Sequence, residues 1–425
     1  MATDPVEQVT VETFQGVGAA DLLAEAKRLA ALPPGSDLPY LSATIDVSPE
    51  GGSPNRRPGR QAFDRAVAEH IADMPAHDPA RLGLEAALER AVPVLDGFEP
   101  SVRGALLVLG GPDGIAEVIP ASLPMPNRLV LGPTPALLDL VRFADDEGSY
   151  VVVAADQRDA EISVVSAAVA DLQITVETNE FPRKQAQGEW SQRRYQMRAD
   201  ERIEAFARTL AQETRRLVES GRVDAVVLAA DDPMRSTLRN EFHQIVAEKV
   251  VGEVSLLLDV APRSVIERTR PVVDAAERVR EVDAAQAVQD GAGPGGRSVT
   301  GAVETLTALQ TGQVMTLVMN DDFQSSGWAD FTLGSYGVGT PPAEHPAGGE
   351  AADLHVVALE QELIRLALLT GAEIEIVRTL APVDPTESTS KGGAAGNRTK
   401  AAEMLDALGG VGAILRYTLA SDRST

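Results

Sequence analysis

Two short, almost wholly apolar segments constrain the fold of this chain more than any other feature. Ser149–Ala167 predicts two strands around a polar turn, and the first of them, YVVVAA, is apolar enough to lie in the centre of a sheet. Val223–Pro233 predicts another buried strand. A long helical pattern lies between the two segments. This strand–helix–strand succession indicates a mixed, mostly parallel sheet with flanking helices.

The helix between these segments is expected from Ser191 to about Ser220, with Gly221 as its C-cap. At about 1.5 Å per residue, such a helix is about 45 Å long. We therefore expect the loop before it to stand clear of its own domain. The predicted buried face of the helix consists of apolar residues at helical spacing, namely Ile203, Phe206, Leu210 and Leu217.

A chain of 425 residues is too long for one compact core, and we expect an α/β protein of three domains, at residues 1–147, 148–272 and 273–425. The last domain is expected to be a small α/β/α sandwich, interrupted by a mobile polar insertion at Asp321–Glu350. The predicted elements of the first domain are helices at Asp21–Leu32, Gln61–Ile71 and Leu82–Val92 and strands at Tyr40–Ser48, Gly104–Gly111 and Arg128–Leu131. Those of the last domain are helices at Val299–Leu309, Leu354–Thr370 and Thr399–Leu408 and strands at Val314–Asn320 and Ala372–Val377.

Composition excludes several kinds of site. The chain has no cysteine, which excludes disulfides, thiolate catalysis and cysteine-ligated zinc. Its five histidines lack the spacing of a metal-binding motif, so we expect no metal and no cofactor. No apolar run reaches the roughly 18 residues of a membrane span, and the N-terminal segment lacks the pattern of a signal peptide. A cytoplasmic protein without membrane contact is therefore expected.

A net charge of −25 argues against a broad nucleic-acid surface, because the mean field repels phosphate. The argument does not apply to local clusters, or islands, of positive charge, because charge is screened beyond about 8 Å at physiological salt. In one island, Arg183–Arg198, five basic residues accompany a single acid, Glu189. Trp190 and Tyr195 lie among the arginines, and both side-chain types stack on unpaired bases. The island predicts RNA contact. The alternative is a solvated helix start whose arginines pair with nearby acids.

Two further patterns point to chemistry less strongly. Asp156 and Asp231-Asp232 end two predicted strands, where carboxylates would be able to share Mg²⁺. The alternative, which we favour, is that Asp232 is an N-cap followed by Pro233 at the first helical position. The segment GAGPGGR matches GxGxxG formally, but a helical pattern precedes it where a dinucleotide site requires a strand. We therefore expect no dinucleotide site.

Three segments of the last domain resemble the C-terminal domain of the archaeal and eukaryotic peptide-chain release factor and Pelota superfamily. They are TGAVETLTALQTGQVMTLVMND, ELIRLALLTGAEIEIV and the closing GGVGAILRY, which is the most specific. In the middle domain, GEWSQRRY, the long helix and VDAVVLAADDP resemble the GGQ-bearing loop, helix and next strand of that superfamily. The resemblance covers about Ser149 to Tyr417. It is nearest in kind to the bacterial branch, which includes the ribosome hibernation factor Balon.

The resemblance implies a three-domain protein that occupies the ribosomal A site. In hydrolytic members of the superfamily, the GGQ positions water against the peptidyl-tRNA ester. Aligning Ser191 with the serine that follows GGQ places Gly188, Glu189 and Trp190 at the motif. A carboxylate would be repelled by an RNA-walled site, and tryptophan lacks the amide that orients water. We therefore expect no catalytic residue here and no hydrolysis by this loop.

The resemblance also implies partners. The middle-domain loop would contact 23S rRNA near the peptidyl-transferase centre, and the first domain would contact 16S rRNA near the decoding centre. Arg56, Arg57 and Arg60 would supply the latter contact, unless they lie on an exposed mobile loop without a partner. The last domain would meet a translational GTPase such as elongation factor Tu. The predicted RNA-binding residues are Arg56, Arg57, Arg60, Arg183, Lys184, Gly188, Trp190, Ser191, Gln192, Arg193, Arg194, Tyr195 and Arg198.

The leading hypothesis is a monomeric factor that binds the 70S ribosome in hibernation or rescue, without catalysis of its own. The alternative is an enzyme acting on stalled ribosomes, either a peptidyl-tRNA hydrolase or a metal-dependent RNase that uses Asp156 and Asp231. A third possibility is an interaction protein that no longer touches RNA, because fold alone does not determine function. The net charge favours this last possibility.

Overall fold

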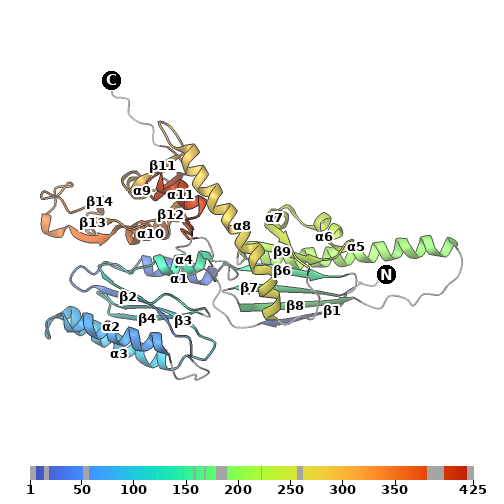
Figure 1. Ribbon diagram of the computed structural model, residues 1–425, viewed down its shortest axis with the longest axis horizontal. Coiled ribbons are helices and arrows are strands. Elements are labelled where there is room, and N and C mark those ends of the chain that lie inside the picture. The colour runs from blue at the N-terminus through green and yellow to red at the C-terminus, as the bar shows by residue number, and fades with distance from the viewer. Residues whose placement is uncertain are drawn as a thin grey trace, which may run out of the picture. The chain divides into compact units, whose positions relative to one another are not determined.

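The structure is a computed structural model of the chain (Figure 1). It describes residues 6–13, 19–50, 57–121, 123–146, 148–156, 159–166, 169–178, 189–221, 223–255, 262–380 and 397–418. The chain divides into two compact units, which differs from the expected three domains. The middle unit comprises Met1–Asp21 and Asp146–Glu277, and the flanking unit comprises Leu22–Asp145 and Arg278–Thr425.

A six-stranded sheet in the order β1-β8-β7-β6-β9-β10 forms the centre of the middle unit. Three of its strand pairs are antiparallel, and only β6–β9 and β9–β10 are parallel. The sheet is therefore mixed, as expected, but not mostly parallel. Its strands are β1 (Val6–Thr13), β6 (Tyr150–Ala155), β7 (Asp159–Ser166), β8 (Val169–Thr178), β9 (Ala225–Ala230) and β10 (Val250–Glu253).

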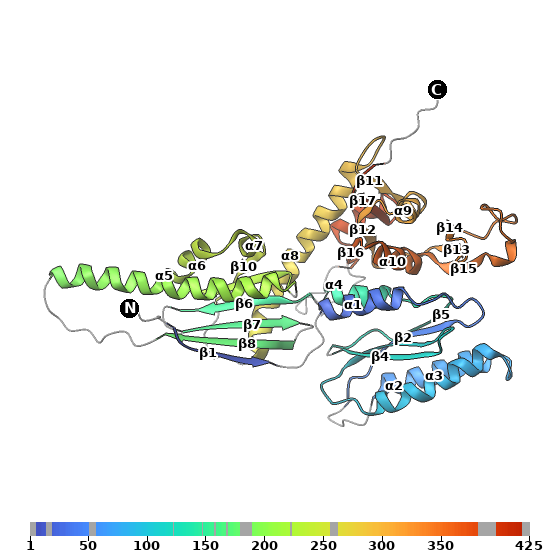
Figure 2. The ribbon, with the colours of Figure 1, turned by 180° about the vertical axis from the view of Figure 1, so that it is seen from behind.

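Helices cover both faces of this sheet (Figure 2). One face of β6 and β9 packs against α5 (Glu189–Glu219), α6 (Met234–Glu241) and α7 (Gln244–Ala247). The other face packs against the first half of α8 (Pro262–Gly291). Coverage on both faces explains why β6 and β9 are apolar at successive residues, and it confirms that both strands are central.

The N-terminal strand β1 differs from the expected domain plan. It pairs with β8 and not with any strand of the first predicted domain, so residues 6–13 belong to the middle unit. The chain passes into the flanking unit after Asp21, returns at Asp146 and leaves again after Glu277. The middle unit is therefore assembled from two separate stretches of sequence.

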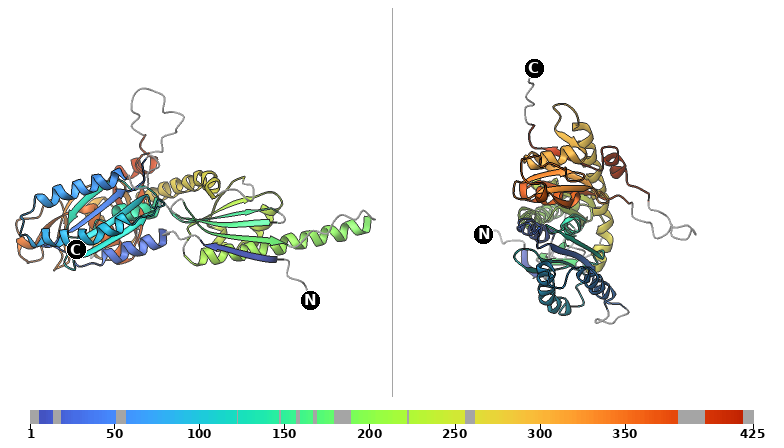
Figure 3. Two further views of the ribbon diagram at one scale, coloured as in Figure 1. Left: turned by 90° about the horizontal axis from the view of Figure 1, so that it is seen from below. Right: turned by 90° about the vertical axis from the view of Figure 1, so that its left-hand side faces the viewer.

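The first sheet of the flanking unit is antiparallel, in the order β4-β3-β2-β5. Its strands are β2 (Tyr40–Asp46), β3 (Gly104–Gly110), β4 (Ile115–Ala121) and β5 (Arg128–Gly132). Helices α2 (Pro58–Ala72) and α3 (Pro79–Asp96) cover one face. Helices α1 (Ala19–Ala30) and α4 (Leu138–Asp146) cover the other (Figure 3).

The second sheet of this unit has the order β11-β17-β12-β16. Its strands are β11 (Ser298–Thr300), β12 (Val314–Asn320), β16 (Glu373–Val377) and β17 (Val411–Leu415). Helices α9 (Gly301–Gln310) and α10 (Leu359–Thr370) cover one face, and α11 (Lys400–Asp406) and the end of α8 cover the other. The expected α/β/α sandwich is confirmed. Side chains of α1 and α4 share one core with α9 and α10, which joins the two sheets into one unit.

The predicted insertion Asp321–Glu350 contains regular structure. It forms β13 (Ser326–Asp330) and β14 (Ser335–Val338), which build a three-stranded antiparallel sheet with β15 (His355–Ala358). A short 3-10 helix, η1 (Ala351–Asp353), precedes β15. The prediction of a helix from Leu354 is wrong over its first residues, because they pair with β13. Among the described helices, none combines the length and the apolar composition needed to cross a bilayer.

Candidate nucleic-acid interface

Helix α5 leads from the predicted RNA-contacting loop into the core of the middle unit. Phe206 and Leu210 are fully buried in this core, and Ile203 and Leu217 pack against it. Gly221, just past the helix, has φ +71°, the left-handed conformation typical of a C-cap glycine. The predicted buried face and C-cap are confirmed.

The first turns of α5 extend beyond the strands of their own sheet (Figure 1, Figure 3). The helix has 31 residues and is therefore about 46 Å long, as the sequence predicts. It begins at Glu189, two residues before the predicted start, so the GGQ-aligned positions Glu189 and Trp190 lie on the helix. The arrangement places the described part of the candidate interface at the end of a long helix.

Most predicted RNA-binding residues lie at this projecting end. Arg183, Lys184 and Gly188 fall between β8 and α5, outside the described residues. The remaining members occupy the first turns of α5, where the backbone is described but the side chains are not, namely Trp190, Ser191, Gln192, Arg193, Arg194, Tyr195 and Arg198.

Farther along α5, the arginines pair with carboxylates. Arg208 contacts Glu241 at 3.2 Å, and Arg215 contacts Glu219 at 2.6 Å. Arg216 contacts a carboxylate one turn away at 2.6 Å. Exposed pairs of this kind contribute little to stability, but they neutralise the charge of the arginines. These later arginines of α5 are therefore neutralised within the protein, and the RNA contact expected at the start of the helix stays a prediction.

The arginines predicted in the flanking unit have partners inside the protein. The guanidinium of Arg57 donates to backbone carbonyls of four residues, at 2.9 to 3.3 Å, namely Val47, Val102, Phe98 and Glu99. Arg60 contacts Asp64 at 2.9 Å and Asp96 at 3.0 Å, and its side chain is only 15% exposed. Both side chains are thus held by their own unit. Arg56 lies outside the described residues.

The strand-end carboxylates do not form a metal centre among the described residues, where no three metal-binding side chains come together. Ala155 and Ala230 are register partners, so Asp156 and Asp231 end adjacent parallel strands. The Asp156 carboxylate, however, accepts a hydrogen bond from the amide of Asp159 at 2.9 Å and closes the turn between β6 and β7.

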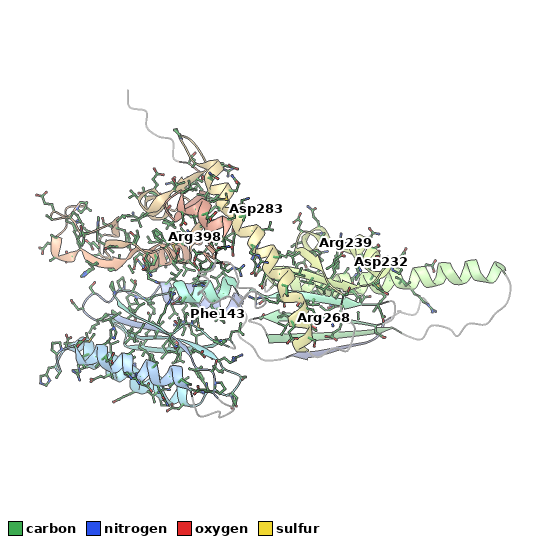
Figure 4. The ribbon with its side chains drawn as sticks, viewed as in Figure 1. Phe143, Asp232, Arg239, Arg268, Asp283 and Arg398 are labelled. Carbon is green, nitrogen blue, oxygen red and sulfur yellow. The ribbon has the colours of Figure 1, made fainter. Side chains whose placement is uncertain are left out.

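Asp232 is not the N-cap that the sequence predicts. Helix α6 begins at Met234, and the cap position is Pro233, which cannot cap through its side chain. The position of Asp232 at the end of β9 can be followed in Figure 4. The GxGxxG match follows α8, as expected, and lines a cavity of about 790 Å³ together with Thr300, Glu304 and Gln313.

A buried polar network lies where α10 meets the loop after β5. Glu362 is 1% exposed and contacts Arg365 at 2.8 Å. Arg365 also donates to the hydroxyl of Tyr336 at 2.7 Å. Burial raises the pKa of Tyr336. Glu362 and Arg365 are one turn apart on α10, but the sequence gives no signal that Tyr336, 29 residues from Arg365, joins them.

Two acidic side chains of the flanking unit, Asp321 and Asp145, have structural roles. Asp321 contacts Arg142 of α4 at 2.9 Å and accepts hydrogen bonds from Thr379. The carboxylate of Asp145 accepts a hydrogen bond from the amide of Ile376 on the edge strand β16 at 3.2 Å. These contacts strengthen the junction between the two sheets of the flanking unit.

Residues 135–273 match the family described as bacterial archaeo-eukaryotic release factor family 10. The matched region contains β6 to β10 and the whole of α5. The resemblance to the bacterial branch of the release-factor and Pelota superfamily is thereby confirmed for this part of the chain. No curated protein sequence matches the chain at a significant level.

The chain is also similar to several solved structures at low sequence identity. Dom34 of S. cerevisiae is 11% identical, covers 99% of this chain and 98% of its own, and has a TM-score of 0.38. Archaeoglobus fulgidus Pelota is 12% identical, with coverage of 99% and 98% and a TM-score of 0.31. The C-terminal domain of the Methanosarcina mazei release factor is 20% identical, with coverage of 36% and 94% and a TM-score of 0.21.

Proposed function

We propose that this protein, whose residues 135–273 match bacterial archaeo-eukaryotic release factor family 10, is a ribosome-associated factor that fills the A site without hydrolysing peptidyl-tRNA. The observation that carries the proposal is the placement of the basic, aromatic segment around Gly188-Glu189-Trp190. The described part of this segment, from Glu189 onward, forms the projecting start of α5, inside the matched region. The cellular process would be hibernation or rescue.

The chemistry of the segment supports binding without catalysis. Arginine forks bind phosphate in a bidentate way, and tryptophan and tyrosine stack on unpaired bases. Glu189 and Trp190 offer neither a small residue nor the amide that orients water. The segment is therefore suited to contact 23S rRNA near the peptidyl-transferase centre and unsuited to activate a nucleophile there.

Contact with 16S rRNA near the decoding centre has less support. The guanidinium groups of Arg57 and Arg60 form hydrogen bonds and ion pairs with other residues of the flanking unit. A contact there would depend on Arg56 or on groups that these two residues position. The last domain would meet a translational GTPase such as elongation factor Tu, in a complex with one copy of this chain per ribosome.

Co-sedimentation with 70S ribosomes at physiological salt tests the proposal. Charge reversal at the start of α5, by Arg193→Glu with Arg194→Glu, is expected to weaken binding at least about tenfold, equivalent to about 1.4 kcal/mol. The matched control is Arg215→Glu with Arg216→Glu, which makes the same charge change on exposed, already paired arginines of the same helix. Equal binding by both variants, or no binding by the unaltered protein, would refute the proposal.

The absence of hydrolysis needs a separate experiment. Ribosomes loaded with peptidyl-tRNA are incubated with the unaltered protein, with and without Mg²⁺. We expect neither peptide release nor RNA cleavage. Release of peptide would support a hydrolase, and Mg²⁺-dependent cleavage that is lost in Asp231→Asn would support an RNase. The variant that combines Glu189→Gly with Trp190→Gln rebuilds the GGQ triplet and shows whether the loop supports release when the motif is present.

A further inference from the structure

The three-stranded sheet β14-β13-β15 lies in the most one-sidedly acidic part of the chain. Between Arg297 and Arg365 the sequence contains neither lysine nor arginine. Around the sheet, Glu344, Glu350 and Asp353 are exposed, and no described cation pairs with them. A partner of this sheet therefore meets negative charge that the protein itself leaves uncompensated.

Strand β15 leaves one edge of this sheet open. The amide of Leu359, just after the strand, donates to the carbonyl of Ser325 at 2.9 Å. This bond shows which residues of β15 point their backbone groups toward β13 and which point them away. Backbone groups of an antiparallel strand point alternately to its two sides. The groups of Val357 therefore bond to β13. The carbonyl of Ala358, which is the N-cap of α10, accepts the first hydrogen bond of that helix. Both backbone groups of Val356 and the amide of Ala358 point to the open side. No described residue bonds to them there.

The side chains along this edge are accessible as well. Val356 is 65% exposed, more than any other large apolar residue among those described, and Ala358 is also exposed. In the second sheet of the flanking unit, by contrast, other groups of the protein cover both edge strands. The Asp145 carboxylate covers an amide on β16, and a bridge between Ala292 and Ser298 covers β11. An uncovered edge with an exposed apolar side chain is unusual, because such an edge is a template for pairing with another chain.

We propose that the open edge of β15 binds an extended, basic segment of a protein partner as a fourth strand. The partner's backbone would pair with both groups of Val356 and with the amide of Ala358, and an apolar side chain of the partner would cover Val356. Lysine or arginine side chains on the partner would face Glu344, Glu350 and Asp353. Nucleic acid is disfavoured at this edge, because phosphate would meet the same carboxylates without a cation between them.

The decisive variant is Ala358→Pro, which deletes an amide donor on the open side of β15. Ala358 has φ −74°, close to the φ that proline requires, and the amide it would lose is not used by β13. The fold is therefore expected to tolerate the change, which thermal unfolding of the full-length protein verifies. A second variant, Val356→Lys, places positive charge at the edge. Its matched control is Val303→Lys on α9, where the valine is 64% exposed.

The probe is a short, capped synthetic peptide of alternating lysine and valine, and binding is followed by fluorescence anisotropy. Unaltered protein is expected to bind the peptide and to gain amide protection at residues 355–358 in hydrogen exchange. Ala358→Pro and Val356→Lys should each weaken binding at least about fivefold, or about 1 kcal/mol, whereas Val303→Lys should not.

Equal binding of a glutamate–valine peptide, or full binding by Ala358→Pro, would overturn the proposal. Preferential binding of a uridine oligonucleotide over the lysine–valine peptide, strengthened by Val356→Lys, would overturn it in favour of RNA. The experiment contains no ribosome, so its outcome does not depend on the proposed function.

Discussion

The hydroxyl of Thr134 donates a hydrogen bond of 2.5 Å to the carboxylate of Glu362, although 228 residues separate them in the sequence. The same α10 turn supplies Gln361, whose side chain accepts hydrogen bonds from the amides of Leu137 and Leu138. These hydrogen bonds link α10 to the segment between β5 and α4, next to the apolar core that the two sheets of the flanking unit share. The two sheets therefore depend on one another for stability.

Removal of the Glu362 carboxylate is expected to destabilise the flanking unit strongly. Glu362→Ala leaves the buried Arg365 without its counter-ion, which costs about 3–5 kcal/mol. Thr134→Val removes only the hydrogen bond from the Thr134 hydroxyl to Glu362 and should lower the free energy of unfolding by about 1–3 kcal/mol. Both values follow from thermal or chemical unfolding. The paired change Glu362→Leu with Arg365→Met should cost less than Glu362→Ala alone, and a larger cost would contradict a charge-based account.

Arg57 distinguishes a structural role from an RNA-binding role. Arg57→Ala loses hydrogen bonds to four carbonyls and should destabilise the flanking unit by about 2 kcal/mol or more. Arg57→Lys keeps the charge, but a single ammonium group lacks the fork that reaches several carbonyls. We therefore expect Arg57→Lys to destabilise the flanking unit nearly as much as Arg57→Ala does. Normal stability combined with weaker ribosome binding in both variants would instead support RNA contact.

Acidification should loosen the three-stranded sheet. Hydrogen bonds from the amides of Leu333 and Thr332, and from His345, lower the pKa of Asp330. A folded-state pKa below the unfolded value of about 3.9 gives stability that is present above about pH 3.9 and lost as the pH falls through the folded value. Hydrogen exchange of residues 326–338 between about pH 2 and pH 5 measures this loss. Asp330→Asn should remove the pH dependence, and parallel curves for the two proteins would rule out this carboxyl as its source.

Gly337 should not tolerate a side chain. A Cβ atom there would stand 2.3 Å from the indole ring of Trp328, so Gly337→Ala must displace the ring or the strand and should cost about 1–3 kcal/mol. The emission of Trp328, recorded in a Trp190→Phe background, reports the displacement. Gly83→Ala is the matched control, because nothing lies within 4 Å of the added atom in helix α3. That change should stabilise the protein by about 0.5–1 kcal/mol.

Local patterns predict the elements whose burial is uniform. Strands β6 and β9 are covered on both faces, and α5 buries one regular stripe, so their signals stand out in the sequence. Strand β4 is half-buried and contains Pro120, which hides its alternation. The strands of the three-stranded sheet are only four or five residues long, and β13 and β14 each contain a glycine, so their local sequence signal is weak.

The sequence predicts the long helix α5 that carries the candidate interface, but not the partners of the arginines in the flanking unit. The charge of Arg183–Arg198 and the length of α5 are local properties, and the sequence displays them directly. Arg57 and Arg60 look equally available in the sequence, because their partners come from segments up to 45 residues away. The hydrogen bond between Glu362 and Thr134 cannot be predicted from the sequence for the same reason, because the two residues are 228 positions apart.

The return of β1 to the middle unit limits how this protein can be dissected. A fragment that starts at residue 22 would lose β1 and uncover the backbone groups of β8 along its whole paired length. Uncovered edges of this kind promote aggregation, so such a fragment would be a poor substitute for the intact chain in binding assays. A single proteolytic cut between α4 and β6 would likewise fail to release either unit, because the chain passes between them at two other places. Gene fragments intended for functional work should therefore retain the N-terminal strand.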